Sequence, residues 1–363
     1  MKHDPELLQQ VDRTFVLLNG RKLVYFGGCD YFRLASHPAV LAAVGTAVDR
    51  YGLNVAASRR TTGNHIVYEE LEAALAGFFG APTATLVSNG YVTNLVATQA
   101  LAGEFTHALI DERAHGSLRD AAQLLGCPLL SFRHRDAVSA ARQARAAGKG
   151  AKILLFTDGL FSQSGQLAPL DEYLRELPKS VVFLVDDAHG AGTVGRQGRG
   201  TMEFLGVTAR RFIQTITLSK AFGVYGGAIL GSRRLRQRIL TCSRLFIGNT
   251  PLPLPLASAA LASLEVLRGD PKLRRRLFFN ASYVKAALQE AGCSLPVGPG
   301  PIVPIVPKDA RAESRIRRNL LARDIHPPFV RYPGGPASGA FRFVISSEHT
   351  AGQLDALVES LTF

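Results

Sequence analysis

The sequence predicts an α/β fold organised around a mostly parallel β-sheet, because short β-rich runs alternate with helical patterns through the middle of the chain. Helices that cover both faces of such a sheet bury its strands, so each strand is expected to be a continuous apolar run. Runs of this kind occupy residues 83–88, 107–110, 152–156, 181–185, 212–216 and 227–230, and a helical pattern covers residues 91–101.

Three regions are expected: an N-terminal arm at residues 1–45, a large domain at 46–250 and a smaller C-terminal domain at 251–363. The proline-rich stretch at 251–255 marks the joint between the two domains. The C-terminal domain is predicted to be α+β, with helices at 257–268 and 272–292 and strands at 302–306 and 341–345.

The composition is that of a globular protein: 363 residues, 47% of them hydrophobic, are ample for a full core. No run is long enough to span a membrane, and the first residues lack the apolar stretch of a signal peptide. Cys29, Cys127, Cys242 and Cys293 are scattered and form no CxxC pair. We therefore expect reduced thiols in a cytoplasmic protein, with neither a disulfide framework nor a metal site.

The net charge of +13 favours anionic partners, such as nucleic acid, phosphate cofactors, coenzyme A or an acidic carrier protein. The arginines are spread along the chain, and neither zinc-finger spacing nor an aromatic and basic RNA-binding motif accompanies them. A solvated basic surface is the simpler interpretation, and a nucleic-acid partner is not expected.

Lys220 lies in the stretch TLSKAFG at 217–223, between the strand-like runs 212–216 and 227–230. Small residues surround it at the end of a strand, so its ammonium group is expected to be crowded and partly dry. Desolvation disfavours the charged form of an amine, and the neutral form is the one that condenses with an aldehyde.

Asp186 ends the run 181–185, and His189 follows three residues later in DDAHG. Alone, Asp186 would be an ordinary loop carboxylate. An amine, an acid and a histidine at the ends of parallel strands together suit pyridoxal 5'-phosphate: the lysine binds its aldehyde, and the acid keeps the pyridinium nitrogen protonated. His189 would reach the phenolic oxygen of the ring or a substrate carbonyl. His115 follows another strand and has a flat ring suited to stacking, although a structural role would explain either histidine.

The stretch Ser88–Tyr91 lies between a strand and a helix, where free amides and the helix dipole attract a phosphate. Thr217 offers a hydroxyl to the same group, and Ser162 follows a further strand. Arg342, in a short strand of the C-terminal domain, can bind a substrate carboxylate through two parallel hydrogen bonds. Each feature alone has an ordinary structural explanation, but their joint occurrence at successive strand ends favours one site.

Several stretches carry a wider pattern: DYFRLASHP at 30–38, SR at 58–59, TG at 62–63, LE at 71–72, HGSL at 115–118, DGLFSQSG at 158–165, DDAHGAGTVGRQGRG at 186–200, TLSKAFGVYGG at 217–227 and the segment 342–350. With these residues the chain resembles the α-oxoamine synthase family of pyridoxal-phosphate enzymes over nearly its whole length. The stretches at 186–200 and 217–223 are the most specific.

The resemblance implies a fold-type-I transferase with a seven-stranded, mostly parallel sheet, and a homodimer whose active sites lie at the subunit interface. It implies that Lys220 binds the cofactor aldehyde, Asp186 pairs with the ring nitrogen and His115 stacks on the ring. His189 and Ser162 would reach the phenolic oxygen or the substrate. The other implied site residues are Asn89, Gly90, Tyr91 and Thr217 for the phosphate, Thr250 from the neighbouring subunit, and Arg342, Cys29 and Ser58 for the substrate.

The chain also departs from the family pattern. Cys29 stands where an asparagine is common, Val55-Ala56-Ala57 replaces a glycine-rich stretch, and Tyr68 replaces a usual histidine. Added side chains in a glycine-lined wall reshape a pocket and leave the cofactor chemistry intact. An unusual amino acid or acyl partner is therefore compatible with the sequence.

The function expected from the resemblance is an acyl transfer. An amino acid would undergo decarboxylative Claisen-type condensation with an acyl thioester, on coenzyme A or an acyl carrier protein, to give an α-amino ketone, carbon dioxide and free thiol. Lys220 would remove the α-proton, and His189 would donate to the developing oxyanion. The alternatives are an aminotransferase or other fold-type-I enzyme, and a non-catalytic partner subunit, which would need no reactive lysine.

Overall fold

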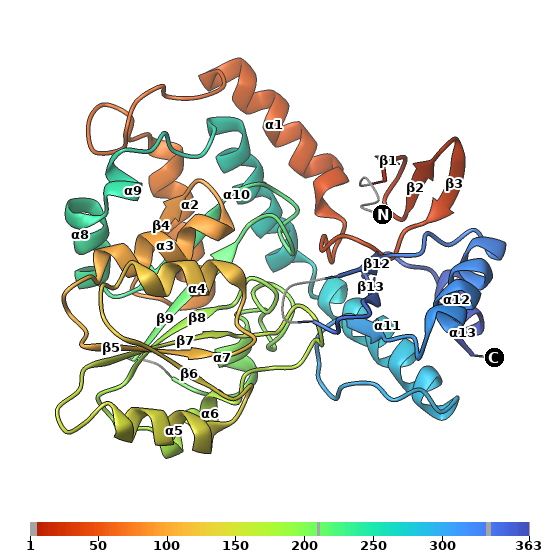
Figure 1. Cartoon of the computed structure of the whole chain (residues 1–363). Coiled ribbons are helices and arrows are strands. Elements are labelled where there is room, and N and C mark those ends of the chain that lie inside the picture. Colours follow the sequence, from red (N-terminus) through yellow and green to blue (C-terminus); the bar gives the residue numbers. More distant parts are fainter. Residues whose placement is uncertain (1–5, 209–210, 332–334, 363) are drawn as a thin grey trace.

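A seven-stranded sheet forms the centre of the larger part of the molecule (Figure 1). The computed structural model describes residues 6–208, 211–331 and 335–362. The strands of this sheet are β4 (Thr83–Val87), β5 (His107–Asp111), β6 (Leu129–Phe132), β7 (Ile153–Asp158), β8 (Val182–Asp186), β9 (Phe212–Thr217) and β10 (Gly227–Gly231). Their order is β4-β10-β9-β8-β7-β5-β6, and β10 runs antiparallel to both of its neighbours. The other neighbouring pairs are parallel, so the predicted mostly parallel seven-stranded sheet is confirmed.

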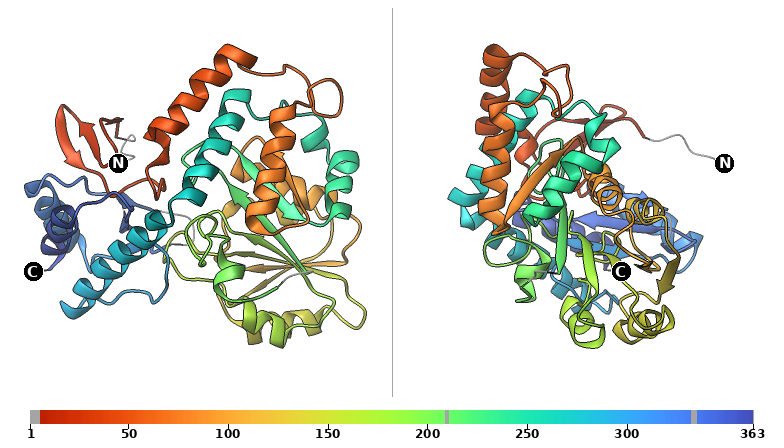
Figure 2. Two further views of the ribbon diagram at one scale, coloured as in Figure 1. Left: turned by 180° about the vertical axis from the view of Figure 1, so that it is seen from behind. Right: turned by 90° about the vertical axis from the view of Figure 1, so that its left-hand side faces the viewer.

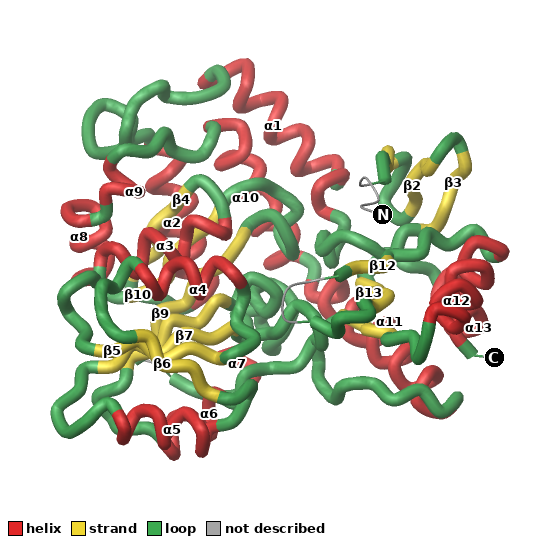
Figure 3. The backbone as a smooth tube through the Cα atoms, viewed as in Figure 1, coloured by secondary structure: helices red, strands yellow, loops and turns green. Residues whose placement is uncertain are grey.

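Helices cover both faces of this sheet (Figures 1 and 3). One layer contains α3 (Gly90–Ala100), α4 (Gly116–Gln123) and α8 (Arg233–Cys242), and the opposite layer contains α5 (Ala137–Ala146) and α6 (Leu170–Glu176). Every residue of β7 and β9 is buried between the layers. This double coverage explains why the strands could be predicted as uninterrupted apolar runs.

A second helical group packs beside the sheet: α1 (Pro38–Tyr51), α2 (Ile66–Phe79) and α10 (Leu254–Gly269) share one buried apolar cluster. The helix α10 begins inside the proline-rich stretch at 251–255, because Pro255 occupies its first turn. Proline is favourable there, since the amide it lacks would have no helical partner. The stretch therefore starts a helix that packs on the larger part, and the domain boundary at residue 251 stays a prediction.

The smaller part contains a three-stranded antiparallel sheet of order β11-β13-β12. Its elements are α11 (Pro271–Glu290), β11 (Ile302–Ile305), α12 (Ala310–Ala322), β12 (Phe329–Val330), β13 (Ala340–Val344) and α13 (Ala351–Leu361). The predicted strands at 302–306 and 341–345 correspond to β11 and β13.

The N-terminal arm packs on this smaller part (Figure 2). It forms an antiparallel sheet of β1 (Leu8–Gln10), β2 (Phe15–Leu18) and β3 (Arg21–Val24), and a short helix, η1 (Leu34–Ser36), follows. Val24 and Phe26 join the buried cluster of the smaller part, and Val24 forms a bridge with Ile325. The segment after β3 then runs back toward the large sheet, which places residues 29–31 between the two parts.

Two short helices, α7 (Thr201–Phe204) and α9 (Arg244–Ile247), complete the described elements. None of the described helices is both long and apolar enough to cross a membrane. The four cysteines are all free.

Candidate active site

A cavity of about 730 Å³ lies between the carboxyl ends of the sheet and the smaller part. It is lined by groups that the sequence analysis placed in one site, although they come from distant segments: Cys29, Tyr91, His115, Ser162, His189, Lys220 and Arg342. The acid at the end of β7, Asp158, lines it as well.

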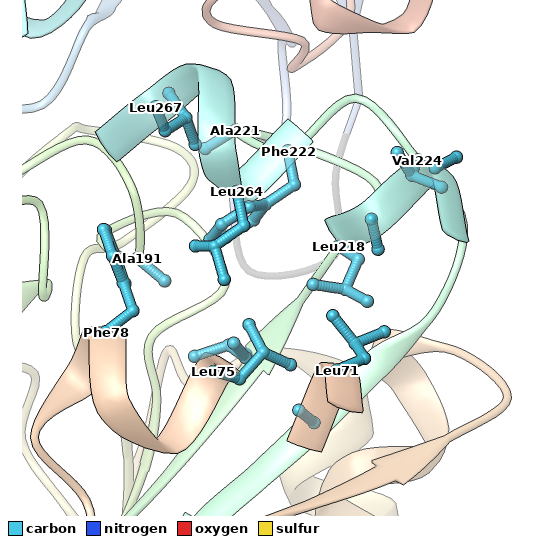
Figure 4. Close-up of a cluster of buried hydrophobic side chains, with 14 of the residues drawn as sticks. Leu71, Leu75, Phe78, Ala191, Leu218, Ala221, Phe222, Val224, Leu264 and Leu267 are labelled. Atoms are coloured by element: carbon cyan, nitrogen blue, oxygen red, sulfur yellow. The ribbon is translucent and has the colours of Figure 1, made fainter. Parts of the chain in front are cut away.

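Lys220 is held on a short, tightly packed loop between β9 and β10. The Gly223 amide donates to the Lys220 carbonyl at 2.9 Å, and the Val224 amide donates to the Leu218 carbonyl at 2.9 Å. Leu218, Ala221 and Phe222 anchor this loop in the buried cluster formed with α2 and α10 (Figure 4). The loop therefore has little freedom to move its lysine away from the cavity.

The Lys220 amine lies 2.8 Å from His189 Nε2. Burial lowers the pKa of Lys220, and the nearby Arg342 lowers it further, while Cys29, Asp186 and Asp158 act in the opposite direction. Burial also lowers the pKa of His189 well below its usual value, with Lys220 as the next cause. The amine and the imidazole therefore both favour their neutral forms.

Asp186 is buried at the end of β8 and is fixed by a hydrogen-bonded amide. Asn94, in α3, donates from Nδ2 to Asp186 Oδ2 at 2.6 Å, and the Ala188 amide donates to Asp186 Oδ1 at 3.1 Å. Thr215 donates in turn to Asn94 Oδ1 at 2.6 Å. The carboxylate is thus oriented by α3 and by the neighbouring strand β9.

His115 precedes α4, and its ring accepts a hydrogen bond from the Ser117 amide at Nδ1, at 3.2 Å. Its own amide donates to Asp158 Oδ2 at 2.9 Å. Burial raises the pKa of Asp158 well above its usual value, and the charge of Asp186 on the adjacent strand adds to this. Asp158 consequently favours the protonated, uncharged form.

Arg342 reaches the cavity from β13. Its Nε donates to the Ser162 carbonyl at 2.6 Å, and its Nη1 and Nη2 each lie 3.7 Å from Cys29 Sγ. The guanidinium therefore joins three segments at the cavity wall: the loop after β7, the arm after β3, and β13.

Gly90 and Thr217 lie in close contact at the start of α3. A Cβ atom at Gly90 would come within 2.6 Å of the Thr217 side chain, so no larger residue fits there. Asn89 caps the helix by accepting from the Val92 amide at 3.1 Å. Tyr91 is largely exposed, and its hydroxyl donates to Asp120. The amides of a first helical turn have no helical partner and are free to meet an anion.

Ser58 and Thr250 lie away from the cavity that Lys220 lines. The Ser58 hydroxyl donates to the Ile247 carbonyl at 2.5 Å. Thr250 borders a small void together with Ser88, and Asn249 donates to the Ser88 hydroxyl at 3.1 Å. Their roles in substrate and phosphate binding stay predictions, which a second copy of the chain would have to complete.

Comparisons with known proteins show which family the chain belongs to. The family model of aminotransferase class I and II matches residues 22–361. The 8-amino-7-oxononanoate synthase of Thioalkalivibrio sulfidiphilus is 35% identical over 348 residues, which are 95% of this chain and 89% of that protein. That of Methylococcus capsulatus is 36% identical over 362 residues, with 98% and 92% covered.

The chain belongs to the α-oxoamine synthase family.

Solved structures agree with this assignment. The serine palmitoyltransferase of Sphingomonas wittichii matches this synthase with a TM-score of 0.93 at 26% identity, over 99% of this chain and 92% of that one. The 8-amino-7-oxononanoate synthase of Francisella tularensis matches with a TM-score of 0.80 at 25% identity, over 94% and 97%. The synthase is a pyridoxal-phosphate-dependent acyltransferase of fold type I, as the resemblance implied.

The residues of this synthase fit pyridoxal phosphate. Lys220 presents a partly dry amine at the cavity wall, and Asp186 is a buried carboxylate that Asn94 already orients. Gly90 packs closely against Thr217 at the start of α3, where the amides of the first turn have no helical partner and can meet an anion. Lys220 lines the cavity itself, whereas Asp186, Asn89, Gly90 and Thr217 are not among its lining residues; Asp186 ends β8, and the other three lie at the start of α3 and the end of β9.

Sequence reasoning missed two buried groups of this synthase, Tyr31 and Asn94. Tyr31 lies 2.6 Å from His189 Nδ1, and Asn94 contacts Asp186. Tyr31 offered no local signal, because its partner is 158 positions away along the chain. Asn94 did offer one, since it is a polar residue inside a predicted helix, three positions before the apolar Ala97 on the same buried face of α3.

Proposed function

We propose that this synthase condenses an amino acid with an acyl thioester, releasing carbon dioxide and thiol. The balanced reaction takes up one proton: the α-carbon gains an acyl group, loses its carboxylate as carbon dioxide, and the thioester sulfur leaves as a thiol. The names of the relatives support acyl transfer, and the observation that carries the proposal is the placement of Lys220, His189 and Arg342 around one cavity.

Pyridoxal phosphate, when bound, supplies an electron sink that stabilises negative charge at the amino-acid α-carbon. Lys220 would hold the cofactor through its amine, and Asp186 would hold the positive ring nitrogen. Gly90, Tyr91 and Thr217 would hold the phosphate at the start of α3, and His115 would cover the ring.

Lys220 is the proposed base. Burial lowers its pKa and so favours the neutral amine, the form that can take the α-proton. The packed loop between β9 and β10 keeps this amine at the cavity wall. A base that is already held in the reactive orientation accelerates proton transfer, because the entropy of positioning it has been lost before the reaction.

His189 and Arg342 are proposed to act on the two substrates. Arg342, already at the cavity wall, would bind the amino-acid carboxylate until that group leaves. His189, held neutral by burial, would donate a hydrogen bond from Nε2 to the oxygen of the thioester, where negative charge develops. The nature of the amino acid and acyl chain would depend on the cavity walls, including Cys29.

A coupled assay tests this function. Purified protein loaded with pyridoxal phosphate is given a panel of amino acids with acyl-coenzyme A or an acyl carrier protein thioester, and free thiol and carbon dioxide are measured. We expect both products in equal amounts, and only when the amino acid and the thioester are present together. Amine transfer to a keto acid without thiol release would favour an aminotransferase instead, and no reaction from any pair would contradict the proposal.

We also infer that the active unit is a homodimer in the cytoplasm. Several large apolar side chains are exposed in the single chain: Leu41 on α1, Leu53 just after α1, Ile66 on α2 and Tyr91 in the first turn of α3. Exposed apolar side chains in such number favour burial by a partner. A second copy would also bring groups such as Thr250 toward the cavity.

A further inference from the structure

Both ring nitrogens of His189 are engaged by other side chains. Nδ1 lies 2.6 Å from the Tyr31 hydroxyl, and Nε2 lies 2.8 Å from Lys220 Nζ. Tyr31 is fully buried and comes from the arm after β3, whereas His189 follows β8 and Lys220 follows β9. Three separate segments therefore converge on this one ring.

The Tyr31 hydroxyl has further neighbours on its other side. Cys29 and Arg342 are both near enough to influence the pKa of Tyr31. Arg342 in turn contacts Cys29 Sγ at 3.7 Å from both Nη1 and Nη2. Lys220, His189, Tyr31, Cys29 and Arg342 therefore form one polar cluster.

Burial is the main reason that His189 does not take a second proton, because it lowers the pKa of the ring well below its usual value. Positive charge on the neighbouring Lys220 or Arg342 would lower that pKa further. Tyr31 keeps its own proton, since burial, reinforced by the Cys29 thiol, raises its pKa well above the usual value. The neutral ring of His189 therefore carries a single proton, which can be on Nδ1 or on Nε2.

A neutral imidazole donates from one nitrogen and accepts at the other. When the Tyr31 O–H donates to Nδ1, the ring proton is placed on Nε2, where it can be donated to the thioester oxygen. Without that hydroxyl, Nδ1 would be buried without a partner, and neither the tautomer nor the plane of the ring would be fixed.

We propose that Tyr31 is a positioning residue for the condensation, whose hydroxyl donates to His189 Nδ1 and so holds the ring as the Nε2–H tautomer aimed at the reacting groups. This inference rests on the proposed function of His189. It differs from a purely structural role, because it makes the tautomer of one ring depend on one oxygen atom.

The experiment compares wild type with Tyr31→Phe, and uses Tyr173→Phe as a matched control. Tyr173 is also fully buried, and its hydroxyl has no hydrogen-bond partner among the described residues, on the face of the sheet covered by α5 and α6. The tautomer of His189 is measured by ¹⁵N NMR on the full-length, cofactor-loaded protein, and its signals are assigned by their loss in His189→Asn. kcat and the dissociation constant of the amino acid are measured on the same samples.

We expect the Nε2–H tautomer in wild type and in Tyr173→Phe. In Tyr31→Phe we expect a changed or mixed tautomer, together with a kcat about 10- to 100-fold lower, because a misplaced catalytic group costs this much. Amino-acid binding should change less than threefold, since Arg342 is retained.

The proposal is overturned if wild type carries the Nδ1–H tautomer, or if Tyr31→Phe keeps the wild-type tautomer and a kcat within twofold of wild type. The wild-type spectrum alone shows which tautomer His189 adopts, even if Tyr31→Phe does not fold. If wild type forms no amino ketone but shows the Nε2–H tautomer held by Tyr31, the proposed function fails while the placement of this proton stands.

Discussion

At the scale of single residues, two adjacent acids in the same loop have different surroundings. Asp186 accepts from Asn94 in α3. Asp187 accepts instead from the Thr201 hydroxyl at 2.6 Å and from Gln214 Nε2 at 2.8 Å. Asp187 is therefore occupied in holding the loop, and Asp186 is the acid that we propose for the cofactor.

Replacing Asp186 by asparagine tests its proposed role. The amide keeps the size of the side chain and can still accept from Asn94, but it lacks the negative charge that keeps the ring nitrogen protonated. We expect kcat to fall on the order of 10²-fold or more, with little change in melting temperature. Activity assays and thermal melts check this, with Asp171→Asn on α6 as the control. An Asp186→Asn enzyme with more than half of the wild-type activity would refute the assignment.

At the scale of elements, the strands could be predicted from the sequence because double coverage makes them uninterrupted apolar runs, as in β7 and β9. The start of α10 was not predicted, because a run of prolines looks like a linker until its place in a first helical turn is seen. Lys220, His189 and Arg342 were found because they follow or lie on predicted strands. Tyr31 lies in an irregular segment of the arm. The path of this segment depends on tertiary packing, so its contact with His189 could not be predicted from the local sequence.

His349 connects the smaller part to the N-terminal arm. In the turn between β13 and α13, its Nδ1 accepts from the Ser346 amide at 3.0 Å, and its Nε2 lies 3.2 Å from the Tyr25 carbonyl in the arm. Burial, followed by the charge of Arg33, lowers the pKa of His349 to about 3. The ring is therefore neutral in the folded protein and would have to lose the Ser346 hydrogen bond to accept a proton.

This lowered pKa predicts acid sensitivity. The unfolded chain takes up a proton on this histidine near pH 6.5, while the folded protein does not until about pH 3, so the stabilising contribution is complete above about pH 6.5 and is lost as the pH falls. Between about pH 8 and pH 5.5 the free energy of unfolding should fall by about 1 kcal/mol more in wild type than in His349→Gln. Urea unfolding at both pH values measures this difference. Equal pH dependence in the two proteins would show that His349 does not titrate on unfolding.

At the scale of the whole molecule, the proposed homodimer predicts a native mass twice the 39.0 kDa of one chain. Ile66, the first residue of α2, is 60% exposed in the single chain, so Ile66→Asp should leave the fold intact but weaken the dimer. We expect this variant to dissociate at low concentration and to lose activity in proportion. Val138→Asp, on the outer side of α5, is the control and should stay dimeric. Sedimentation measures both, and a fully active wild-type monomer would contradict the inference.

The proposed site combines side chains from the large sheet, the smaller part and the N-terminal arm. The large sheet supplies Lys220, Asp186 and His189, the smaller part supplies Arg342, and the arm supplies Tyr31. Lys220, His189 and Arg342 line the cavity, and Tyr31 contacts it through His189, because the arm packs on the smaller part and then returns to the sheet.

Locating the bond between the protein and its cofactor shows whether Lys220 is the residue that carries pyridoxal phosphate. The protein is incubated with pyridoxal phosphate, reduced with borohydride, digested and mapped by mass spectrometry. We expect a phosphopyridoxyl group on Lys220 in wild type and none at this position in Lys220→Ala. A label on any other lysine, or an unlabelled Lys220, would contradict this assignment.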